Sequence, residues 1–200
     1  MKHLEPLNLL INRLARLPGV GRRSAERMAF RLALDTKSLR RDLVTALEEV
    51  DAHVCCCSRC GNLTLKSKDP CAICTDDRRD RHLMCVVEDP SGIQQIEAAG
   101  AYQGVYHCMM GKLSPMQGQD IPPDSVERLL TRVREEKVRE VILAFDSDME
   151  SDATTSYLHE RLGGEGVQVT RLAFGIPAGS GIAYSDPVTL ARALHGRQGF

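Results

Sequence analysis

The sequence predicts an α/β protein of several modules. We expect an N-terminal helical hairpin module, a small four-cysteine zinc module, a domain built on a parallel β-sheet, and a C-terminal glycine-rich loop with a helix. Apolar residues first recur at helical spacing, two Cys-x-x-Cys pairs follow, and short apolar runs then alternate with helical patterns. Such alternation is typical of a parallel sheet covered by helices. We place the modules at residues 1–54, 55–78, 79–172 and 173–200.

The composition is that of a protein with a substantial core. At 200 residues and 42% hydrophobic content, the chain can bury the core of one or two domains. It has no apolar run of about 18 residues and no signal-peptide pattern, so we expect a cytoplasmic protein without membrane contact. There the eight cysteines should be thiols or metal ligands. Four Phe, four Tyr and no Trp argue against a stacking platform for single-stranded nucleic acid.

Positive charge is concentrated near the N-terminus, although the whole chain has a net charge of −1. Residues 1–41 contain ten Lys or Arg residues and three acidic residues, a net charge of +7, which leaves −8 for the remainder. This asymmetry indicates a polyanion-binding end joined to an acidic body. From charge alone, a merely solvated basic helix explains the pattern equally well.

Three helices are predicted in the basic module. Residues 4–17 have the spacing of an amphipathic helix, which ends at residues 18–21 because a proline and two glycines break helical geometry. A second helix should begin near Ser24. A third helix carries an apolar stripe that we expect to pack behind the first two: Leu39, Leu43, Leu47 and Val50.

The turn between the first two helices predicts a phosphate-binding site. Gly19 and Gly21 permit a tight turn and expose amide N–H groups ahead of a helix N-terminus, which attracts anions. Arg22, Arg23 and Arg27 add positive side chains beside it. The alternative is an ordinary helical corner with a glycine C-cap. The pattern resembles the helix-hairpin-helix motif, which binds DNA phosphates without reading sequence, so such contacts would supply affinity but no base specificity.

The cysteine segment predicts a structural zinc site. Cys57 and Cys60 form one Cys-x-x-Cys pair, and Cys71 and Cys74 form a second pair ten residues later. Two such turns direct four thiolates at one centre, which suits Zn²⁺. A redox-active pair is the alternative, but redox motifs occur singly and beside a helix. Because four sulfurs leave the metal no open position, we expect zinc to fold the module rather than to catalyse.

Four further cysteines surround this pattern. Cys55 and Cys56 directly precede the first pair, and either could compete as a ligand. Cys85 and Cys108 lie in apolar strand contexts, and we expect them in the core.

After the cysteines, residues 76–81 form a charged stretch that we interpret as a surface connection. The hydrophobic pattern beyond it predicts alternating strands and helices. The predicted strands are residues 83–87, 105–109, 141–145 and 167–172. The predicted helices are residues 91–99, 125–136, 153–162 and 187–195, with a loop at residues 111–123.

Acidic residues follow two of the predicted strands. Glu88 follows the strand at residues 83–87, and Asp146 and Asp148 follow the strand at residues 141–145. Functional groups of an open parallel sheet collect beyond the carboxyl ends of its strands, so these carboxylates should face one another. A Toprim domain has this arrangement, and its carboxylates suit Mg²⁺. We expect weak Mg²⁺ binding here, because carboxylates held close together raise their pKa values or recruit a metal.

The alternative for such acids is that they cap the following helix and meet its positive end. We expect this role for Glu150 and Asp152. For Glu88, Asp146 and Asp148, the sequence favours neither the metal-binding role nor the capping role.

The order of these modules resembles the RecR family of bacterial recombination mediators, over nearly all 200 residues. The stretches that match family signatures are residues 17–21, 24–25, 27–30, 85–88, 113–115, 140–144, 175–177, 184 and 189–190.

The resemblance implies a non-enzymatic DNA-binding protein that assembles as a ring-like tetramer. It further implies action with RecO and RecF to load recombinase on gapped DNA, in the cytoplasm and at the nucleoid during repair. Arg23 and Arg27 match the DNA-contacting positions of the family, and Glu88 and Glu150 match a face that contacts a partner.

One departure from the family pattern keeps a rival interpretation open. Many relatives carry non-acidic residues where Asp146 and Asp148 stand. A fuller acidic set suits a Toprim metal-dependent nuclease, with Glu88 as general base and the two aspartates as Mg²⁺ ligands.

Overall fold

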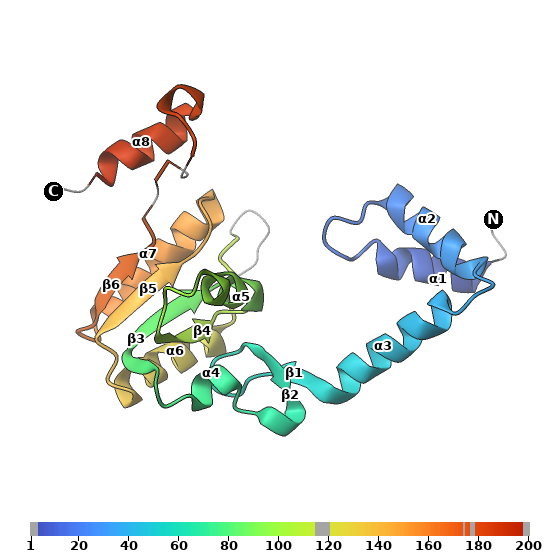
Figure 1. The fold of residues 1–200 in the computed structure, drawn as a ribbon, viewed down its shortest axis with the longest axis horizontal. Helices are drawn as coiled ribbons and strands as arrows, with labels where there is room; N and C mark the ends of the chain where they lie inside the picture. The colour runs from blue at the N-terminus through green and yellow to red at the C-terminus, as the bar shows by residue number, and fades with distance from the viewer. Residues whose placement is uncertain (1–3, 115–120, 174, 177–178, 198–200) are drawn as a thin grey trace. The chain divides into compact units, whose positions relative to one another are not determined.

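The computed structural model describes residues 4–114, 121–173, 175–176 and 179–197. It divides the chain into two compact units, Met1–Val54 and Cys55–Phe200. The first unit is helical, and the second holds the cysteine segment, a parallel sheet and the C-terminal helix (Figure 1). The predicted mixed α/β class is confirmed. No helix in the described ranges is both long and apolar enough to cross a lipid bilayer.

The first unit is built on a hairpin of two helices, α1 (Glu5–Leu14) and α2 (Arg22–Ala33). Apolar residues on the facing sides of these helices form a small core, in which alanines let the two backbones approach closely. The turn predicted at residues 18–21 separates them. The fully buried residues of this core are Ile11, Ala25 and Ala29.

Helix α3 (Leu39–His53) does not pack as predicted. None of its side chains is fully buried by the described residues. The exposed fractions of its apolar stripe are 43% for Leu39, 42% for Leu43, 70% for Leu47 and 56% for Val50. Helices α1 and α2 bury their apolar faces against each other, and the described residues of this unit leave the stripe of α3 largely exposed. It remains as the kind of apolar patch that marks an interaction surface.

The cysteine segment folds into short elements that the hydrophobic pattern does not reveal. Strands β1 (Val54–Cys56) and β2 (Leu63–Leu65) pair with each other. A 3₁₀ turn, η1 (Lys66–Lys68), and a single helical turn, α4 (Ala72–Thr75), follow. Elements of three or four residues contain too few side chains to show a periodicity.

The predicted parallel sheet is present in the second unit. Its strands lie in the order β4-β3-β5-β6, and each neighbouring pair is parallel. At its centre, Met84 of β3 lies opposite Val105 of β4 and Val141 of β5. The strands are β3 (Asp80–Val87), β4 (Gly104–Cys108), β5 (Glu140–Ala144) and β6 (Gln168–Arg171).

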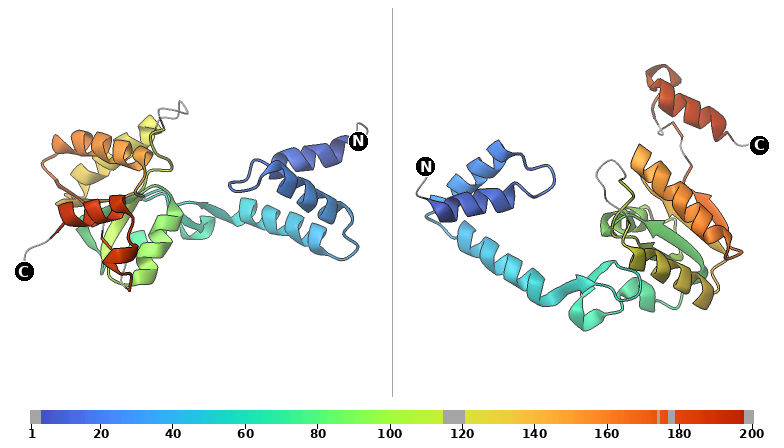
Figure 2. Two further views of the ribbon diagram at one scale, coloured as in Figure 1. Left: turned by 90° about the horizontal axis from the view of Figure 1, so that it is seen from above. Right: turned by 180° about the vertical axis from the view of Figure 1, so that it is seen from behind.

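Helices cover both faces of this sheet (Figure 2). Alternate residues of β3 face opposite sides: Met84 and Val86 pack in the core under α6 and α7, while Cys85 and Val87 pack under α5. The central strand is thus buried on both faces, as its continuous apolar run predicts. The covering helices are α5 (Pro90–Ala99), α6 (Pro123–Glu135) and α7 (Met149–Gly163).

The charged stretch at residues 76–81 is only partly a surface connection. The side chain of Arg79 is 12% exposed and forms an ion pair with Glu97 at 2.5 Å. Arg81 donates to the carbonyl of Cys74 at 3.4 Å, and β3 already begins at Asp80. The long side chains of these two arginines contact other elements of the unit, and the order of charges along the sequence does not reveal such contacts.

The C-terminal segment contains a 3₁₀ turn, η3 (Ile182–Tyr184), and helix α8 (Pro187–His195), whose bounds are those predicted. The Asp186 carboxylate accepts hydrogen bonds from the first turn of α8 and so fixes its start. Arg192 forms an ion pair with Asp152 of α7 at 3.2 Å, which ties the last helix to the sheet domain.

Candidate functional site

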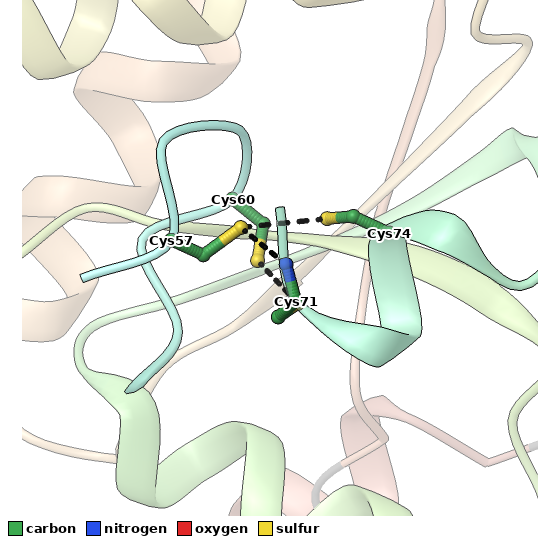
Figure 3. Close-up of side chains that lie close together, drawn as sticks. All are labelled: Cys57, Cys60, Cys71 and Cys74. Atoms are coloured by element: carbon green, nitrogen blue, oxygen red, sulfur yellow. Dashed lines mark hydrogen bonds between the residues drawn. The ribbon is translucent and has the colours of Figure 1, made fainter. Parts of the chain in front are cut away.

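Four cysteine side chains converge in the second unit (Figure 3). Cys57 and Cys60 come from the loop between β1 and β2, Cys71 precedes α4, and Cys74 lies in α4. Each is at most 3% exposed, and their sulfur atoms all lie within 4.8 Å of one another. The structure therefore brings together the four residues predicted as zinc ligands.

The spacing of the sulfurs fits a tetrahedral metal centre. A Zn–S bond of about 2.3 Å places the sulfurs of a regular tetrahedron about 3.8 Å apart. The Sγ atoms of Cys57 and Cys74 are 3.9 Å apart, and those of Cys60 and Cys71 are 3.6 Å apart. The backbone N–H groups of Cys71 and Asn62 donate to the sulfurs of Cys57 and Cys60. Such bonds stabilise thiolates.

The thiols of the cluster affect the protonation of one another. The hydrogen bond between Cys60 and Cys71 raises the pKa of the Cys60 thiol and lowers that of Cys71. Four thiolates this close repel one another unless a cation neutralises them. Zn²⁺ fits the all-sulfur donor set, and since four sulfurs fill its coordination shell, it would stabilise the fold.

The cysteine cluster is also joined to the edge of the parallel sheet. The backbone N–H of Cys108 in β4 donates to the carbonyl of Cys60 at 2.8 Å. Gly61 has a φ of +80°, and a Cβ there would lie 2.9 Å from the Cβ of Cys108. Glycine is therefore required at position 61, between the cluster and β4. Because β4 is hydrogen-bonded to the cluster, a metal bound there would also stabilise this edge strand.

The remaining cysteines lie outside the cluster. Cys55 is half-buried and Cys56 exposed, and neither belongs to the group of converging sulfurs. Cys85 and Cys108 are buried beneath α5, which confirms their predicted place in the core. Burial raises the pKa of Cys85 to about 12 and that of Cys108 to about 11, so both remain protonated thiols.

In the first unit, the two glycines of the hairpin turn have different roles. Gly19 has a φ of +74°, a backbone conformation that side chains disfavour, so the turn itself requires glycine there. Gly21 is the N-cap of α2 with a φ of −72° and a ψ of 162°, which any residue adopts. A Cβ on Gly21 would meet nothing within 4 Å. The fold therefore does not explain the glycine at position 21.

The first turn of α2, directly after Gly21, presents free backbone N–H groups. No side chain caps this helix, and within residues 4–54 no hydrogen bond forms to the backbone N–H groups of Arg22, Arg23 and Ser24. Because α2 begins at Arg22 rather than near Ser24 as predicted, these groups are the free N–H groups of its first turn. The turn thus combines free donors, the positive helix end and open space above Gly21.

The arginines beside the turn divide into two kinds. Arg22 donates to Asn12 of α1 at 2.6 Å and forms an ion pair with Glu26 at 3.2 Å, so it braces the helix pair. Arg23 and Arg27 are exposed, and in the described part of the unit no ion pair holds them. Their guanidinium groups are available to an anion at the helix start.

At the carboxyl edge of the parallel sheet, three adjacent strands deliver charged residues. Glu88 follows β3, and Asp146 and Asp148 follow the neighbouring strand β5. On the other side of β3, the chain leaves β4 through Met110, which has a φ of +59°, and reaches Lys112. The placement of the acids follows the prediction, and the lysine was not anticipated.

Lys112 lies among the carboxylates. Its Nζ is 2.8 Å from Asp148 Oδ2 and 3.7 Å from both Glu88 Oε2 and Glu150 Oε2. Of the three carboxylates predicted to bind Mg²⁺, Glu88 and Asp148 thus already have the Lys112 ammonium beside them. Among the described residues, the four cysteines are the group of three or more potential ligands that comes within metal-binding distance.

The acids after β5 have separate partners. Asp148 is the N-cap of α7 and accepts from the N–H of Ser151 at 2.7 Å, so the helix starts earlier than the predicted residue 153. Glu150 accepts a short hydrogen bond from the Ser114 hydroxyl. Asp152 pairs with Arg192. The capping hydrogen bond itself is made by Asp148, while Glu150 and Asp152 lie in the first turn of α7, where their negative charges meet the positive helix end as expected.

The local pKa values follow from these contacts. The hydrogen bond from Lys112 lowers the pKa of Asp148 to about 2, and the N–H of Ser151 adds to this effect. Burial raises the pKa of Glu88, against the opposing influence of Lys112. Because the pKa of Asp148 is lowered in the folded protein, its ionised carboxylate stabilises the fold at pH values above the ordinary carboxyl pKa of 3.8. This contribution is lost as the pH falls from 3.8 towards 2.

A buried polar network beneath the sheet was also not predicted. Arg132 of α6 donates to the carbonyl of Tyr106 at 2.7 Å and forms an ion pair with Glu136 at 3.0 Å. The Glu136 carboxylate also accepts a hydrogen bond from Arg59 at 3.2 Å. Burial lowers the pKa of the adjacent His107 to about 3, so this imidazole is neutral. In the sequence, these charges resemble the solvated face of a helix.

Three family models match parts of this chain. The family model "RecR, helix-hairpin-helix" matches residues 7–50, the model "Toprim domain" matches residues 82–173, and the model "RecR, C-terminal" matches residues 175–198.

Three curated relatives are each called "Recombination protein RecR". The protein of Moorella thermoacetica is 45% identical over 197 residues, which is 98% of each chain. That of Bifidobacterium longum subsp. infantis is 44% identical over 94% of each chain, and that of Koribacter versatilis is 41% identical over 98% of each chain. With this identity over nearly its whole length, the chain belongs to the RecR family.

Proposed function

We propose that this chain is a DNA-binding mediator of recombinational DNA repair that holds one structural Zn²⁺ and carries out no catalysis. Its relatives bear the name of a recombination protein, which supports the general role. Within that role, we propose action with RecO and RecF to load recombinase on gapped DNA, in the cytoplasm and at the nucleoid.

The observation that carries DNA binding is the glycine at position 21. The fold does not require it, yet it leaves open space above three unpaired N–H groups at a helix start. A phosphate oxygen bound close to the backbone would need that space. Arg23 and Arg27 would then contact phosphates beside it, and none of these groups distinguishes one base from another.

Replacing Gly21 with serine tests this site without disturbing the fold. Serine adopts the observed conformation and is a favoured N-cap, so its hydroxyl should accept from the free N–H groups and leave the melting temperature unchanged or higher. Because it fills the space and occupies the donors, DNA affinity should fall about tenfold. Fluorescence anisotropy with labelled duplex DNA measures the loss. Unchanged affinity in a folded Gly21→Ser protein would contradict the proposed site.

We further propose that the chain acts as a homo-oligomer, a tetrameric ring. The stripe of α3 supports this, because the described residues leave its apolar side chains 42–70% exposed. Exposed apolar side chains in the C-terminal segment, such as Ile182 at 68% and Val188 at 63%, offer a second surface. Light scattering should report the mass of four chains.

The sheet edge is proposed as a partner face. Glu88 and Glu150 each have side chains 32% exposed, so they remain accessible to a partner while they contact Lys112. The rival activity, a Toprim phosphodiesterase, is favoured by one observation: Glu88 and the exposed Asp146 line the same small cavity, of about 90 Å³. Against it, Asp148 is engaged as a helix cap and by Lys112, so it is not free to bind a metal.

A further inference from the structure

At the carboxyl edge of the sheet, a Toprim domain implies a divalent cation, and the residues present do not fit one. Such a cation requires several free carboxylate oxygens directed at one point. Here the Lys112 ammonium stands between Glu88, Asp148 and Glu150, at 2.8 Å from the nearest oxygen and 3.7 Å from the other two. We propose that Lys112 takes the place of the divalent cation and holds this acidic face in shape without metal.

The geometry around Lys112 is that of a built position rather than a chance surface contact. Its side chain is only 21% exposed, although lysine is ordinarily among the most exposed residues. The left-handed conformation of Met110 and the turn at Gly111, whose N–H donates to the carbonyl of Glu88, bring the chain back over the sheet edge. The N–H of Leu113 then donates to Thr154 of α7 at 2.9 Å. Lys112 is thus fixed on both sides by backbone contacts.

The carboxylates around Lys112 are satisfied by other donors as well. Asp148 accepts from the N–H of Ser151 at the positive end of α7, and Glu150 accepts from the Ser114 hydroxyl. A Mg²⁺ ion demands near-octahedral oxygen ligands and gives up its water reluctantly. To bind here, it would have to expel the ammonium and break the helix cap. The lysine and these donors together exclude it.

Lys112 is a positioning residue, and its removal should create a metal site. Without the ammonium, Glu88, Asp148 and Glu150 face one another with no positive charge between them, and such a set recruits a cation. Methionine keeps most of the length and apolar stem of lysine and removes only its charge. Lys112→Met should therefore bind a divalent cation that the unaltered protein does not bind.

Mn²⁺ is a suitable probe, because it prefers oxygen ligands as Mg²⁺ does and does not compete for an all-sulfur zinc site. The electron paramagnetic resonance signal of free Mn²⁺ is followed as zinc-loaded full-length protein is added, in the absence of DNA. We expect no saturable binding to the unaltered protein up to millimolar Mn²⁺. Lys112→Met should bind one Mn²⁺ per chain saturably in the same range, with a dissociation constant at least about tenfold below the highest Mn²⁺ concentration used.

Two control variants separate this effect from a general loss of charge. Lys112→Arg keeps the cation and should bind no Mn²⁺, like the unaltered protein. Lys68→Met removes an exposed lysine in the η1 turn and should also bind none. Mn²⁺ binding by Lys68→Met equal to that of Lys112→Met would overturn the assignment, since any lost positive charge would then suffice.

Two further results would also overturn the proposal. One is a folded Lys112→Met protein that gains no Mn²⁺ affinity. The other is saturable Mn²⁺ binding to the unaltered protein that disappears in Asp146→Asn combined with Asp148→Asn. This second measurement needs no Lys112 variant, so the proposal stays testable even if Lys112→Met does not fold.

Discussion

Replacing Cys71 with alanine is expected to release the zinc and to unfold the cysteine segment, with a loss of soluble yield. Cys71 supplies a buried sulfur to the cluster, and its backbone N–H donates to the sulfur of Cys57. A structural zinc ion contributes on the order of 10 kcal/mol to a module of this kind, more than the net stability of most domains. Because Cys60 also accepts a backbone hydrogen bond from β4, the damage should extend to the edge of the sheet.

Metal analysis and thermal melting check this prediction on protein purified without chelators. Cys56→Ala is the matched control, since Cys56 is exposed and lies outside the cluster. It should retain one zinc ion per chain and the original melting temperature. An unaltered protein without zinc, or a Cys71→Ala protein that keeps its zinc and its melting temperature, would show that the four sulfurs do not form the proposed metal centre.

Arg23→Ala and Arg27→Ala should each weaken DNA binding by roughly tenfold or more at moderate salt, because a charge-assisted hydrogen bond is worth about 1.5–3 kcal/mol. The loss should be the same on unrelated sequences, since the proposed targets are phosphates. On duplex DNA, each lost contact should also reduce the slope of log affinity against log salt by about 0.9. Both side chains are exposed, so the stability of the hairpin should change little.

Titrations at several salt concentrations, on two unrelated duplexes, measure both effects. Arg161→Ala provides the control, because it removes one positive charge from α7 in the other unit. It should leave affinity and salt slope nearly unchanged. If Arg23→Ala or Arg27→Ala altered the preference for one sequence while the salt slope stayed constant, the hairpin would be contacting bases and the proposal would fail.

The features that could be predicted from the sequence are those with a regular spacing. The two Cys-x-x-Cys pairs located the sulfur cluster, because a tight turn fixes where both of its sulfurs point. The continuous apolar run at residues 83–87 located the central strand of a parallel sheet, buried on both faces. The position of Glu88 and Asp148 at one edge followed from the rule that parallel strands end on the same side.

What could not be predicted depends on side chains that meet across the fold. Lys112 lies in a predicted loop after β4, and nothing in its neighbourhood marks it as the partner of acids after β3 and β5. Arg79 lies in a charged stretch that predicts a surface connection, yet its side chain reaches Glu97 on α5. The apolar stripe at residues 39–50 correctly predicts helix α3, but the described residues of its unit leave that stripe largely exposed. Periodicity gives the apolar face of an element and does not say what covers it.

The most direct test of the central claim uses labelled gapped DNA and zinc-loaded protein in the presence of Mg²⁺ or Mn²⁺. A DNA-binding mediator without catalysis should form a stable complex in which both strands stay intact, whichever metal is added. Contradiction would come from strand cleavage that requires the metal and disappears in Asp146→Asn combined with Asp148→Asn. Such cleavage would assign this sheet edge to phosphodiester hydrolysis and make the Toprim nuclease the correct interpretation.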